Sequence, residues 1–192
     1  GRITGTKLLE ACFGSGASAT FDRARHVLIL ACGTSYHSGL VARYWMEEIA
    51  GVSCTVEIAS EFRYRKAAIP ANTLLITISQ SGETADTLAA LRHVKDRVLD
   101  TLAICNVPSS SLVRESGLSL MTHAGPEIGV ASTKAFTTQL VALMLTTIAL
   151  GRRNGLTEEV EADIVGQLRT LPYLAQEVLK LDEEIERVST EF

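Results

Sequence analysis

The stretch from Leu74 to Thr84, LLITISQSGET, decides the fold of this chain and indicates where its chemistry lies. Its first five residues are apolar apart from one threonine, and they run directly into polar side chains that precede a helical pattern. This order predicts a buried strand that ends at the N-terminus of a helix. A helix N-terminus offers free backbone N–H groups and the positive end of the helix dipole, so it binds anions, most often phosphate. A single serine there is commonly a helix cap, but Ser79, Gln80, Ser81 and Thr84 together exceed what one cap requires, so they predict an anion site.

The bulk composition describes a folded domain and excludes several classes of protein. With 192 residues, 46% hydrophobic content and a net charge of −4, the chain is long and apolar enough to bury a sizeable core. It has no long basic run, which argues against nucleic-acid binding. Its longest apolar segment, residues 140–150, is interrupted by two threonines and is too short to cross a membrane.

The cysteines and the start of the chain indicate where the protein resides. The four cysteines form no C-x-x-C pair, so we expect neither a disulfide framework nor a metal site, and a reducing cytoplasm is the expected location. The first residues have no signal-peptide core. They also lack an initiator Met and have a helical appearance, so we expect the chain to be a piece of a longer protein.

Strand-like and helix-like segments alternate along the chain. Short apolar and β-branched segments predict strands at residues 26–31, 53–58, 72–79, 101–106 and 118–123. Helical patterns follow at residues 34–50, 84–98 and 133–150. The first of these has Val41, Trp45 and Ile49 at helical spacing, and the third is mostly apolar and is expected to be buried. The alternation predicts an α/β fold in three layers, in which helices cover both faces of a five-stranded parallel sheet.

The C-terminal part, residues 156–192, is expected to form amphipathic helices. Before Pro172, Val160, Ile164 and Leu168 recur at helical spacing. After it, the apolar residues recur at alternating spacings of four and three, at Leu174, Val178, Leu181, Ile185 and Val188. Two interpretations are open: this tail packs on its own domain, or it packs on a missing neighbour domain or a second subunit.

Three polar loops follow predicted strands and are expected to meet at one edge of the sheet. They are CGTS at residues 32–35, SQSGET at residues 79–84 and GPEIGVAST at residues 125–133. Ligands of open α/β sheets bind outside the carboxyl ends of the strands, which is where these loops begin. Neither the G-x-G-x-x-G pattern nor a P-loop is present, which argues against a nucleotide site.

Candidate catalytic residues in and near these loops are few. Cys32 has no placed histidine partner, so we expect an inert thiol. His37 lies near the first loop, and Glu83 and Glu127 are the carboxylates available as acids or bases, although Glu83 also suits a helix N-terminus. No pair of carboxylates stands out, and we assign no catalytic residue. The loops therefore predict a binder of phosphate esters with little acid–base equipment.

Taken together, the three loops resemble those of the sugar isomerase (SIS) domain. Residues 31–35 (ACGTS), 79–84 (SQSGET) and 127–136 (EIGVASTKAF) are most similar to the first of two SIS halves in the glutamine–fructose-6-phosphate aminotransferase family. The resemblance covers residues 20–150 in detail and the tail more loosely. It implies that residues 1–192 form a single SIS domain, with a core at about 20–150 and a helical tail at 156–192.

The resemblance also implies an activity and a set of binding residues. Enzymes of this family make glucosamine 6-phosphate from fructose 6-phosphate and glutamine, and the resemblance implies no metal and no other cofactor. By position, the residues implied to hold the phosphate are Ser35, Ser79, Gln80, Ser81 and Thr84. Those implied to contact the sugar are Thr34, Ser132 and, through its backbone, Val130.

The chain departs from the family pattern in what it lacks. It has no glutaminase domain with an N-terminal cysteine, and no second SIS half, which in the family carries the glutamate base and the ring-opening histidine. The C-terminal segment with the sugar-contacting lysine is also missing. We expect the glutaminase domain and the second half as partners in the parent chain, we expect a homodimer, and we expect this chain alone to be inactive.

Two alternatives to an aminotransferase fragment are open. One is a non-catalytic SIS module that senses a phosphosugar in a regulator, which the absence of a helix-turn-helix or basic region disfavours. The other is a phosphosugar isomerase or deglycase that acts by itself, which the lack of a convincing base disfavours.

Overall fold

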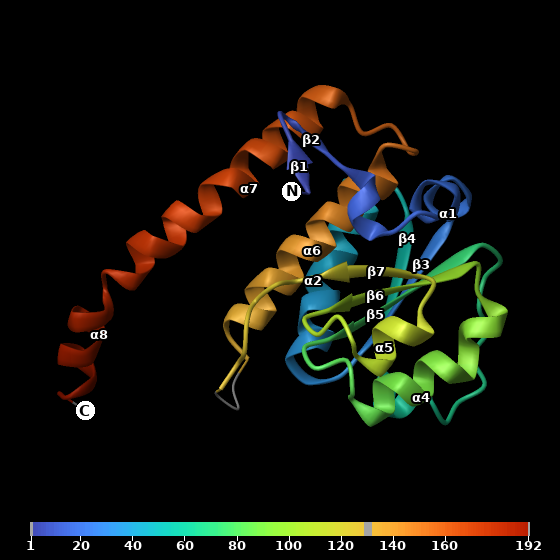
Figure 1. Ribbon diagram of the computed structural model, residues 1–192, viewed down its shortest axis with the longest axis horizontal. Helices are drawn as coiled ribbons and strands as arrows, with labels where there is room; N and C mark the ends of the chain where they lie inside the picture. Colours follow the sequence, from blue (N-terminus) through green and yellow to red (C-terminus); the bar gives the residue numbers. More distant parts are fainter. Residues whose placement is uncertain (1, 129–131, 192) are drawn as a thin grey trace.

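A parallel sheet of five strands organises the chain (Figure 1). The structure is a computed structural model, and it describes residues 2–128 and 132–191. The strand order is β4-β3-β5-β6-β7, and every neighbouring pair is parallel. The strands are β3 (His26–Ala31), β4 (Ser53–Ile58), β5 (Thr73–Ser79), β6 (Asp100–Cys105) and β7 (Leu118–Met121). The five predicted strands are therefore confirmed, and all seven residues of the central strand β5 are buried.

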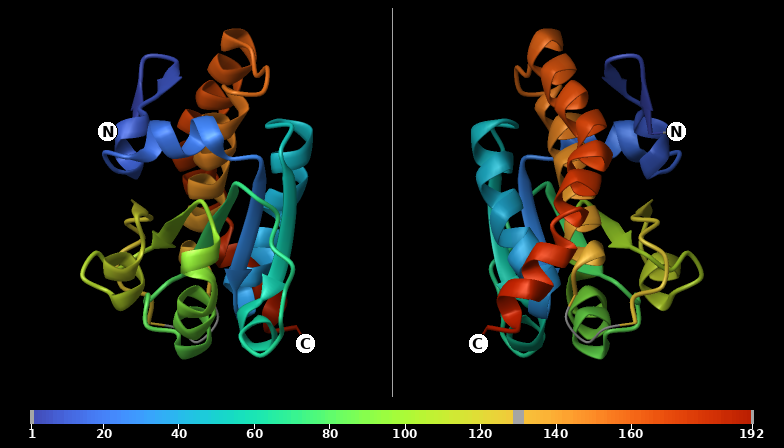
Figure 2. Two further views of the ribbon diagram at one scale, coloured as in Figure 1. Left: turned by 90° about the vertical axis from the view of Figure 1, so that its right-hand side faces the viewer. Right: turned by 90° about the vertical axis from the view of Figure 1, so that its left-hand side faces the viewer.

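Helices cover both faces of this sheet, as Figures 1 and 2 show. One face packs against α2 (Gly33–Glu48) and α6 (Lys134–Gly151), with α1 (Ala17–Arg23) beside α6. The other face packs against α3 (Ala59–Phe62), α4 (Ala85–Val94) with the 3-10 turn η2 (Lys95–Arg97), and α5 (Ser111–Glu115). Two separate clusters of buried side chains fill the two interfaces. The predicted three-layer α/β fold is confirmed.

Helix α2 does not bury its inner face through the apolar residues that stand at helical spacing. Its buried residues are Ser38, Gly39, Ala42 and Met46, whereas Val41 is exposed and Trp45 and Ile49 are only partly buried. A side chain added at Gly39 would place its Cβ 3.0 Å from both the Ile29 and the Val56 side chains. The helix lies so close to the sheet at Gly39 that small residues form this part of its inner face, and Val41, Trp45 and Ile49 lie at the margin.

Helix α6 is the most apolar element of the chain. By length and composition it could cross a membrane, but 61% of it is buried inside the domain, as in a core helix. The hydroxyls of Thr146 and Thr147 lie within the core and donate to the carbonyls of Ala142 and Leu143 one turn earlier. Local pairing satisfies both threonines, so they do not interrupt the packing. The predicted burial of this helix is confirmed.

The N-terminal segment folds onto the end of α6. No pattern in the sequence predicted this contact. It forms an antiparallel pair, β1 (Ile3–Thr4) and β2 (Lys7–Leu8), followed by the 3-10 turn η1 (Glu10–Phe13). The expectation of a helical opening is therefore wrong for residues 3–8. Leu8 and Phe13 are buried, and the ring of Phe13 meets that of Phe21 edge to face at 5.1 Å.

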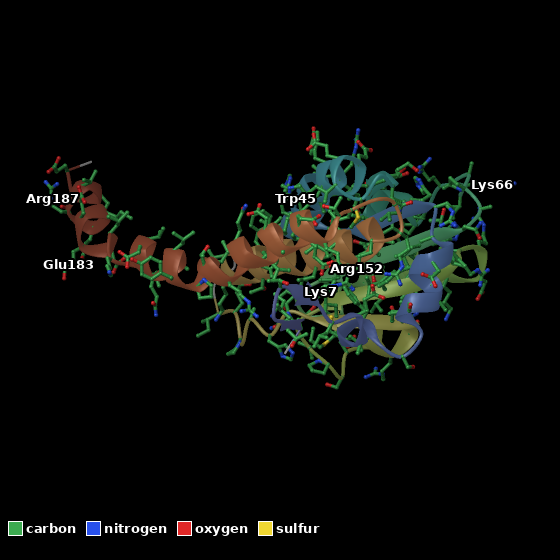
Figure 3. All side chains as sticks on the ribbon, turned by 90° about the horizontal axis from the view of Figure 1, so that it is seen from above. Lys7, Trp45, Lys66, Arg152, Glu183 and Arg187 are labelled. Carbon is green, nitrogen blue, oxygen red and sulfur yellow. The ribbon has the colours of Figure 1, made fainter. Side chains whose placement is uncertain are left out.

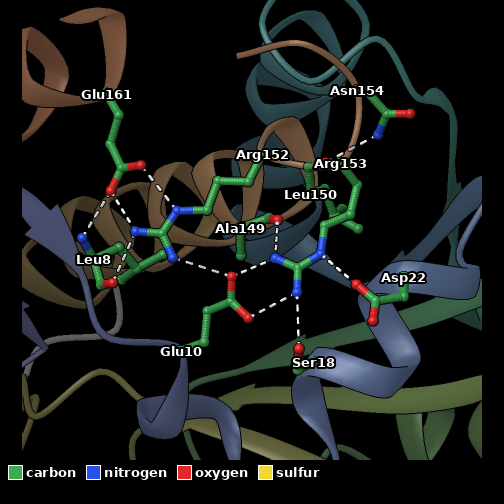
Figure 4. A network of polar contacts seen from close by, with 10 residues as sticks. All are labelled: Leu8, Glu10, Ser18, Asp22, Ala149, Leu150, Arg152, Arg153, Asn154 and Glu161. Atoms are coloured by element: carbon green, nitrogen blue, oxygen red, sulfur yellow. Dashed lines mark hydrogen bonds and ion pairs between the residues drawn. The ribbon is translucent and has the colours of Figure 1, made fainter. Parts of the chain in front are cut away.

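A network of charged side chains holds this segment in place (Figure 4). Arg152 donates to Glu161 at 2.8 Å, to Glu10 at 3.1 Å and to the carbonyl of Leu8 at 2.9 Å. Arg153 pairs with Glu10 and, at 2.8 Å, with Asp22. The network joins four segments that are far apart in the sequence: the opening, α1, the end of α6 and the start of the tail.

The tail consists of α7 (Glu158–Leu179) and α8 (Asp182–Ser189), and it extends away from the sheet (Figures 1 and 3). The first half of α7 packs on the domain through Ile164, Val165 and Leu168, whereas Val160 is exposed. The helix continues through Pro172. Beyond it, every apolar residue of the predicted stripe is exposed, namely Leu174, Val178, Leu181, Ile185 and Val188. The interpretation that this part packs on its own domain is wrong.

Candidate functional site

A pocket of about 250 Å³ opens at the carboxyl edge of the sheet, where the three polar loops meet. Seven of the eight predicted binding residues line it: Thr34, Ser35, Ser79, Gln80, Ser81, Thr84 and Ser132. Val130, the eighth, lies outside the residues that the structure describes. Cys32, Ile78 and Glu127 also line the pocket and were missing from the predicted set, although Cys32 and Glu127 belong to the loops that the sequence singled out. The parallel sheet thus brings three segments of sequence to one place.

The loop after β5 turns its hydroxyl oxygens toward its own backbone. Ser79 Oγ accepts a hydrogen bond from the N–H of Gly82 at 3.0 Å and lies 3.1 Å from Thr84 Oγ1. Ser81 Oγ accepts from the N–H of Glu83 at 3.1 Å. A serine hydroxyl that accepts one bond keeps its own proton to donate. These bonds therefore fix the oxygen positions and leave donors for a ligand.

Helix α4 begins immediately after this loop. Thr84 is its N-cap residue, and within the described part of the chain its side chain makes no capping hydrogen bond. Helix capping therefore does not account for the hydroxyls of this loop, because none of them pairs with the first turn of α4 among the bonds described. The first-turn N–H groups and the positive end of the helix dipole point toward the loop, which is the arrangement that favours an anion.

Gly82 is required for the shape of this loop. Its φ is +69°, in the left-handed region that favours glycine. An added Cβ would overlap Ser110 Oγ and would lie 2.7 Å from Cys105 Sγ. Both the backbone conformation and the packing of the next loop therefore exclude a side chain here.

The loop after β3 forms the second wall of the pocket. Gly33 has a φ of +55° and opens α2, and a Cβ there would have no heavy atom within 4 Å. Ser35, in the first turn of α2, accepts a hydrogen bond at 3.0 Å from the side-chain amide of Gln139 on α6. Gln139 is almost fully buried. It was not predicted from the sequence, because a glutamine inside an apolar helix gives no motif.

The third wall is the segment before α6, and Glu127 organises its described part. The carboxylate of Glu127 accepts from the backbone N–H of Thr133 at 2.8 Å and from the hydroxyls of Ser132 and Thr133, each at 3.3 Å. The hydrogen bond from the Thr133 N–H is the main reason that the pKa of Glu127 lies below its ordinary value. Glu127 is therefore a carboxylate at neutral pH and is the only formally charged side chain among the described residues of the pocket.

Asn106 ties the loops after β6 and β7 together behind this wall. Its side-chain oxygen accepts from the N–H of Ala124 at 2.7 Å and from the hydroxyl of Thr122 at 3.1 Å. Its side-chain nitrogen donates to the carbonyl of Gly125 at 2.8 Å. The segment it holds includes His123, whose φ of +54° is unusual for a residue with a side chain. These contacts set the path of the chain into Glu127.

The other candidate catalytic residues do not form an acid–base pair in the pocket. His37 is exposed and packs edge to face on Tyr36, and it is not among the residues that line the pocket. The carboxylate of Glu83 accepts from the N–H of Ser111 at 2.7 Å, which lowers its pKa and makes it a cap for α5. Cys32 lines the pocket half-buried, and its sulfur lies 4.0 Å from the hydroxyl of Thr87. Within residues 2–128 and 132–191, no three His, Cys, Asp or Glu side chains are grouped to hold a metal ion.

The fold and the loops lead to a family. A family model described as the SIS domain matches residues 20–149, which is more than half of the chain. The chain belongs to the SIS domain family. The resemblance stated from the three loops is thereby confirmed, and the matched residues agree closely with those on which it depended.

Among SIS proteins, several curated aminotransferases are close relatives of this chain. Glutamine–fructose-6-phosphate aminotransferase [isomerizing] from Pseudomonas syringae pv. tomato is 59% identical over 194 residues, and the match covers all of this chain and 32% of that protein. The protein of the same name from Escherichia coli K12 is 55% identical over 193 residues, with the same coverage. This SIS chain therefore spans about a third of the length of the curated relatives it matches.

A solved structure agrees with the sequence comparison. The C-terminal domain of glucosamine-fructose-6-phosphate aminotransferase from Francisella tularensis matches with a TM-score of 0.94 and 47% identity. The match covers 98% of this chain and 53% of that one. The SIS fold that the sequence predicted, including its C-terminal helices, is confirmed.

Proposed function

We propose that this SIS chain is the phosphosugar-binding part of the isomerase domain of a glutamine–fructose-6-phosphate aminotransferase. The observation that carries the proposal is the pocket at the carboxyl edge, in which seven residues implied by the resemblance come together from three loops. The identity of 59% to an aminotransferase of that name supports the choice of sugar, fructose 6-phosphate or glucosamine 6-phosphate.

In this proposal the phosphate binds where neutral donors gather. Backbone N–H groups fix the oxygens of Ser79 and Ser81. The proton of Ser81 and one proton of the Ser79–Thr84 hydroxyl pair are left to donate, and the starts of α2 and α4 supply the positive ends of two helix dipoles. Ser35, Gln80 and Thr84 complete the proposed phosphate cradle. The cradle contains no basic side chain among its described residues, so hydroxyl and backbone donors provide the affinity.

The sugar lies in this proposal toward Thr34, Ser132 and the backbone of Val130. The hydroxyl of Ser132 donates to Glu127, so the lone pairs of its oxygen are available to sugar hydroxyls. Because Glu127 carries the only formal charge among the described residues of the pocket, its repulsion of a phosphate dianion favours one orientation, with the phosphate at the serine loop and the sugar at Glu127. Glu127 thus contributes to orientation through its charge.

The full reaction requires parts that we propose to belong to the parent protein. A glutaminase domain would release ammonia, and a second SIS half would supply the base and the group that opens the sugar ring. The residues here bind and orient the substrate, and an acid–base group held at the reacting carbons is still needed for the proton shift.

We further propose that residues 1–192 form one SIS domain, that the parent protein is a homodimer, and that it is located in the cytoplasm. The relatives support this assignment over a phosphosugar-sensing regulator.

The proposal is tested by titrating the chain with inorganic phosphate and fructose 6-phosphate while NMR shifts are followed. The signals of residues 79–84 should move with both ligands. Ser81→Ala should weaken phosphate binding about tenfold, which corresponds to one hydrogen bond to a charged group. Ser189→Ala is a matched control on α8, where the serine hydroxyl bonds only the carbonyl of Glu186 among the described contacts, and it should change nothing. Shifts confined to another surface, or equal affinities for both variants, would refute the site.

A further inference from the structure

The side chain of Gln139 is a buried amide that points from α6 to the pocket wall. It is 1% exposed, in a helix whose other buried residues are mostly apolar. Its Nε2 donates to Ser35 Oγ at 3.0 Å, and its Oε1 lies 3.3 Å from Ser38 Oγ, which donates. Ser38 Oγ also lies 2.7 Å from the carbonyl of Ser35, so its single proton is shared between that carbonyl and the amide oxygen of Gln139. An amide is costly to bury unless it is hydrogen-bonded, and both ends of this one meet the first turns of α2.

The direction of these bonds determines what the Ser35 hydroxyl can do. A hydroxyl has one proton to donate and two lone pairs that accept. Because the amide of Gln139 donates to Ser35 Oγ, it occupies a lone pair and leaves the Ser35 proton free. Ser35 lines the pocket, so this proton is available to an acceptor there. In this arrangement the amide nitrogen of Gln139 lies at Ser35, and its oxygen lies at Ser38 and shares the Ser38 proton with the carbonyl of Ser35.

We propose that Gln139 is a positioning residue, which makes the Ser35 hydroxyl a hydrogen-bond donor to the phosphate group of the bound sugar. This inference rests on the proposed function of the pocket. Gln139 itself is buried behind Ser35 and does not line the pocket, so it acts through Ser35 alone. A side chain at position 139 that can only accept hydrogen bonds would accept the one from the Ser35 hydroxyl. The lone pairs of Ser35 Oγ would then face the anion. An apolar side chain would leave the hydroxyl free to rotate.

The test measures the affinity of the 192-residue chain for inorganic phosphate by calorimetry. The variants are Ser35→Ala, Gln139→Met, Gln139→Glu and the double variant Ser35→Ala/Gln139→Met. Ser35→Ala should weaken phosphate binding about tenfold, and Gln139→Met about three- to tenfold, since a directed hydrogen bond to a charged group is lost or loosened. Gln139→Glu is nearly isosteric and keeps the packing, and it should weaken binding more than Gln139→Met does. Thr138→Val is the control, because the Thr138 hydroxyl bonds only within α6 among the described contacts, and it should bind like the unsubstituted chain.

The double variant separates positioning from a general structural effect. If Gln139 acts through Ser35, adding Gln139→Met to Ser35→Ala should cause no further loss of phosphate affinity. A further loss as large as that of Gln139→Met alone would overturn the inference. Equal phosphate affinity of Gln139→Met, Gln139→Glu and the unsubstituted chain would also overturn it and would leave the proposed function intact. Absence of any phosphate binding to the unsubstituted chain would overturn both.

If Gln139→Met fails to fold, the other variants decide the matter. Gln139→Glu retains the shape of the side chain, and Ser35→Ala/Gln139→Glu completes a second cycle in the same assay. Unfolding by urea is followed for every variant, so that a loss of stability is not counted as a loss of affinity. Stronger or unchanged phosphate binding by folded Gln139→Glu would overturn the inference.

Discussion

Replacing Gly82 by alanine should destabilise the domain by about 2–5 kcal/mol. Two costs contribute, and both follow from the structure. The φ of +69° is a left-handed conformation, which costs a residue with a Cβ about 1–2 kcal/mol. The new Cβ would also overlap Ser110 Oγ and lie 2.5 Å from Ser110 Cβ, and such overpacking costs about 1–3 kcal/mol. Urea denaturation followed by circular dichroism measures the sum.

Gly33→Ala is the matched control for the backbone cost. Gly33 lies at the same pocket with a φ of +55°, and its Cβ would meet no heavy atom within 4 Å. It should therefore lose only about 1–2 kcal/mol, the conformational part of the Gly82 effect. The difference between the two variants measures the steric part.

Removing the obstacle tests the steric part directly. The Ser110→Gly substitution removes the atoms nearest to the new Cβ and leaves a contact with Cys105 Sγ at 2.7 Å. Gly82→Ala should therefore lower the free energy of unfolding less in a Ser110→Gly background than in the unsubstituted chain. The reasoning is refuted if Gly82→Ala and Gly33→Ala cost the same, or if Ser110→Gly brings no relief. Gly82→Ala should also weaken phosphate binding, because the loop that carries Ser79 and Ser81 must shift.

Three further predictions concern the charged network, Cys32 and the activity of the isolated chain. Burial opposes the charged form of Glu161, but hydrogen bonds from Arg152 and from the N–H of Leu8 lower its pKa overall from the ordinary value of 4.5. The ionised carboxylate of Glu161 therefore stabilises the fold above about pH 4.5, and this contribution is lost as the pH falls through the lower pKa of the folded state. Glu161→Gln should therefore flatten the decline of the unfolding free energy at acidic pH, and an unchanged profile would contradict the prediction. Cys32→Ser in the parent enzyme should retain substantial sugar isomerisation, and complete loss with the fold intact would show that the thiol takes part in the reaction. The purified chain with fructose 6-phosphate and excess ammonium should form glucosamine 6-phosphate only at the uncatalysed rate, and turnover near that of an intact aminotransferase would place the base at Glu127, Glu83 or His37.

The order of the fold was predictable because its central strands are buried on both faces. Largely apolar segments such as residues 27–31 and 74–78 have few alternatives to a parallel strand, and polar residues at their ends locate the binding edge. Six of the seven site residues that line the pocket lie within five residues of the end of β3 or β5, and Ser132 lies just before α6, so the three loops that carry the resemblance located them.

What the sequence did not predict depends on contacts between distant segments. Small residues form the inner face of α2 near Gly39 because the sheet approaches closely there, and the helical spacing of the large apolar residues does not mark this face. The N-terminal opening packs through Leu8 and Phe13, and it is held in place because Glu10 pairs with Arg152 and Arg153, which lie more than 140 positions later in the sequence. Gln139 has a role only because α6 lies against α2. Pairings of this kind have no local period, so no pattern in the sequence reveals them.

The position of α6 in the chain affects how the protein can be synthesised and divided. All five strands are complete by Met121, but the helix that closes one face of the sheet is not complete until Gly151. A growing polypeptide therefore carries apolar side chains of β6, such as Leu102 and Ile104, without the cover of α6 while some thirty residues are added. Such exposure favours aggregation, so this interval is where a chaperone or slow translation would matter most. A fragment that ends before residue 134 should be insoluble even though it contains the whole sheet and most of the pocket.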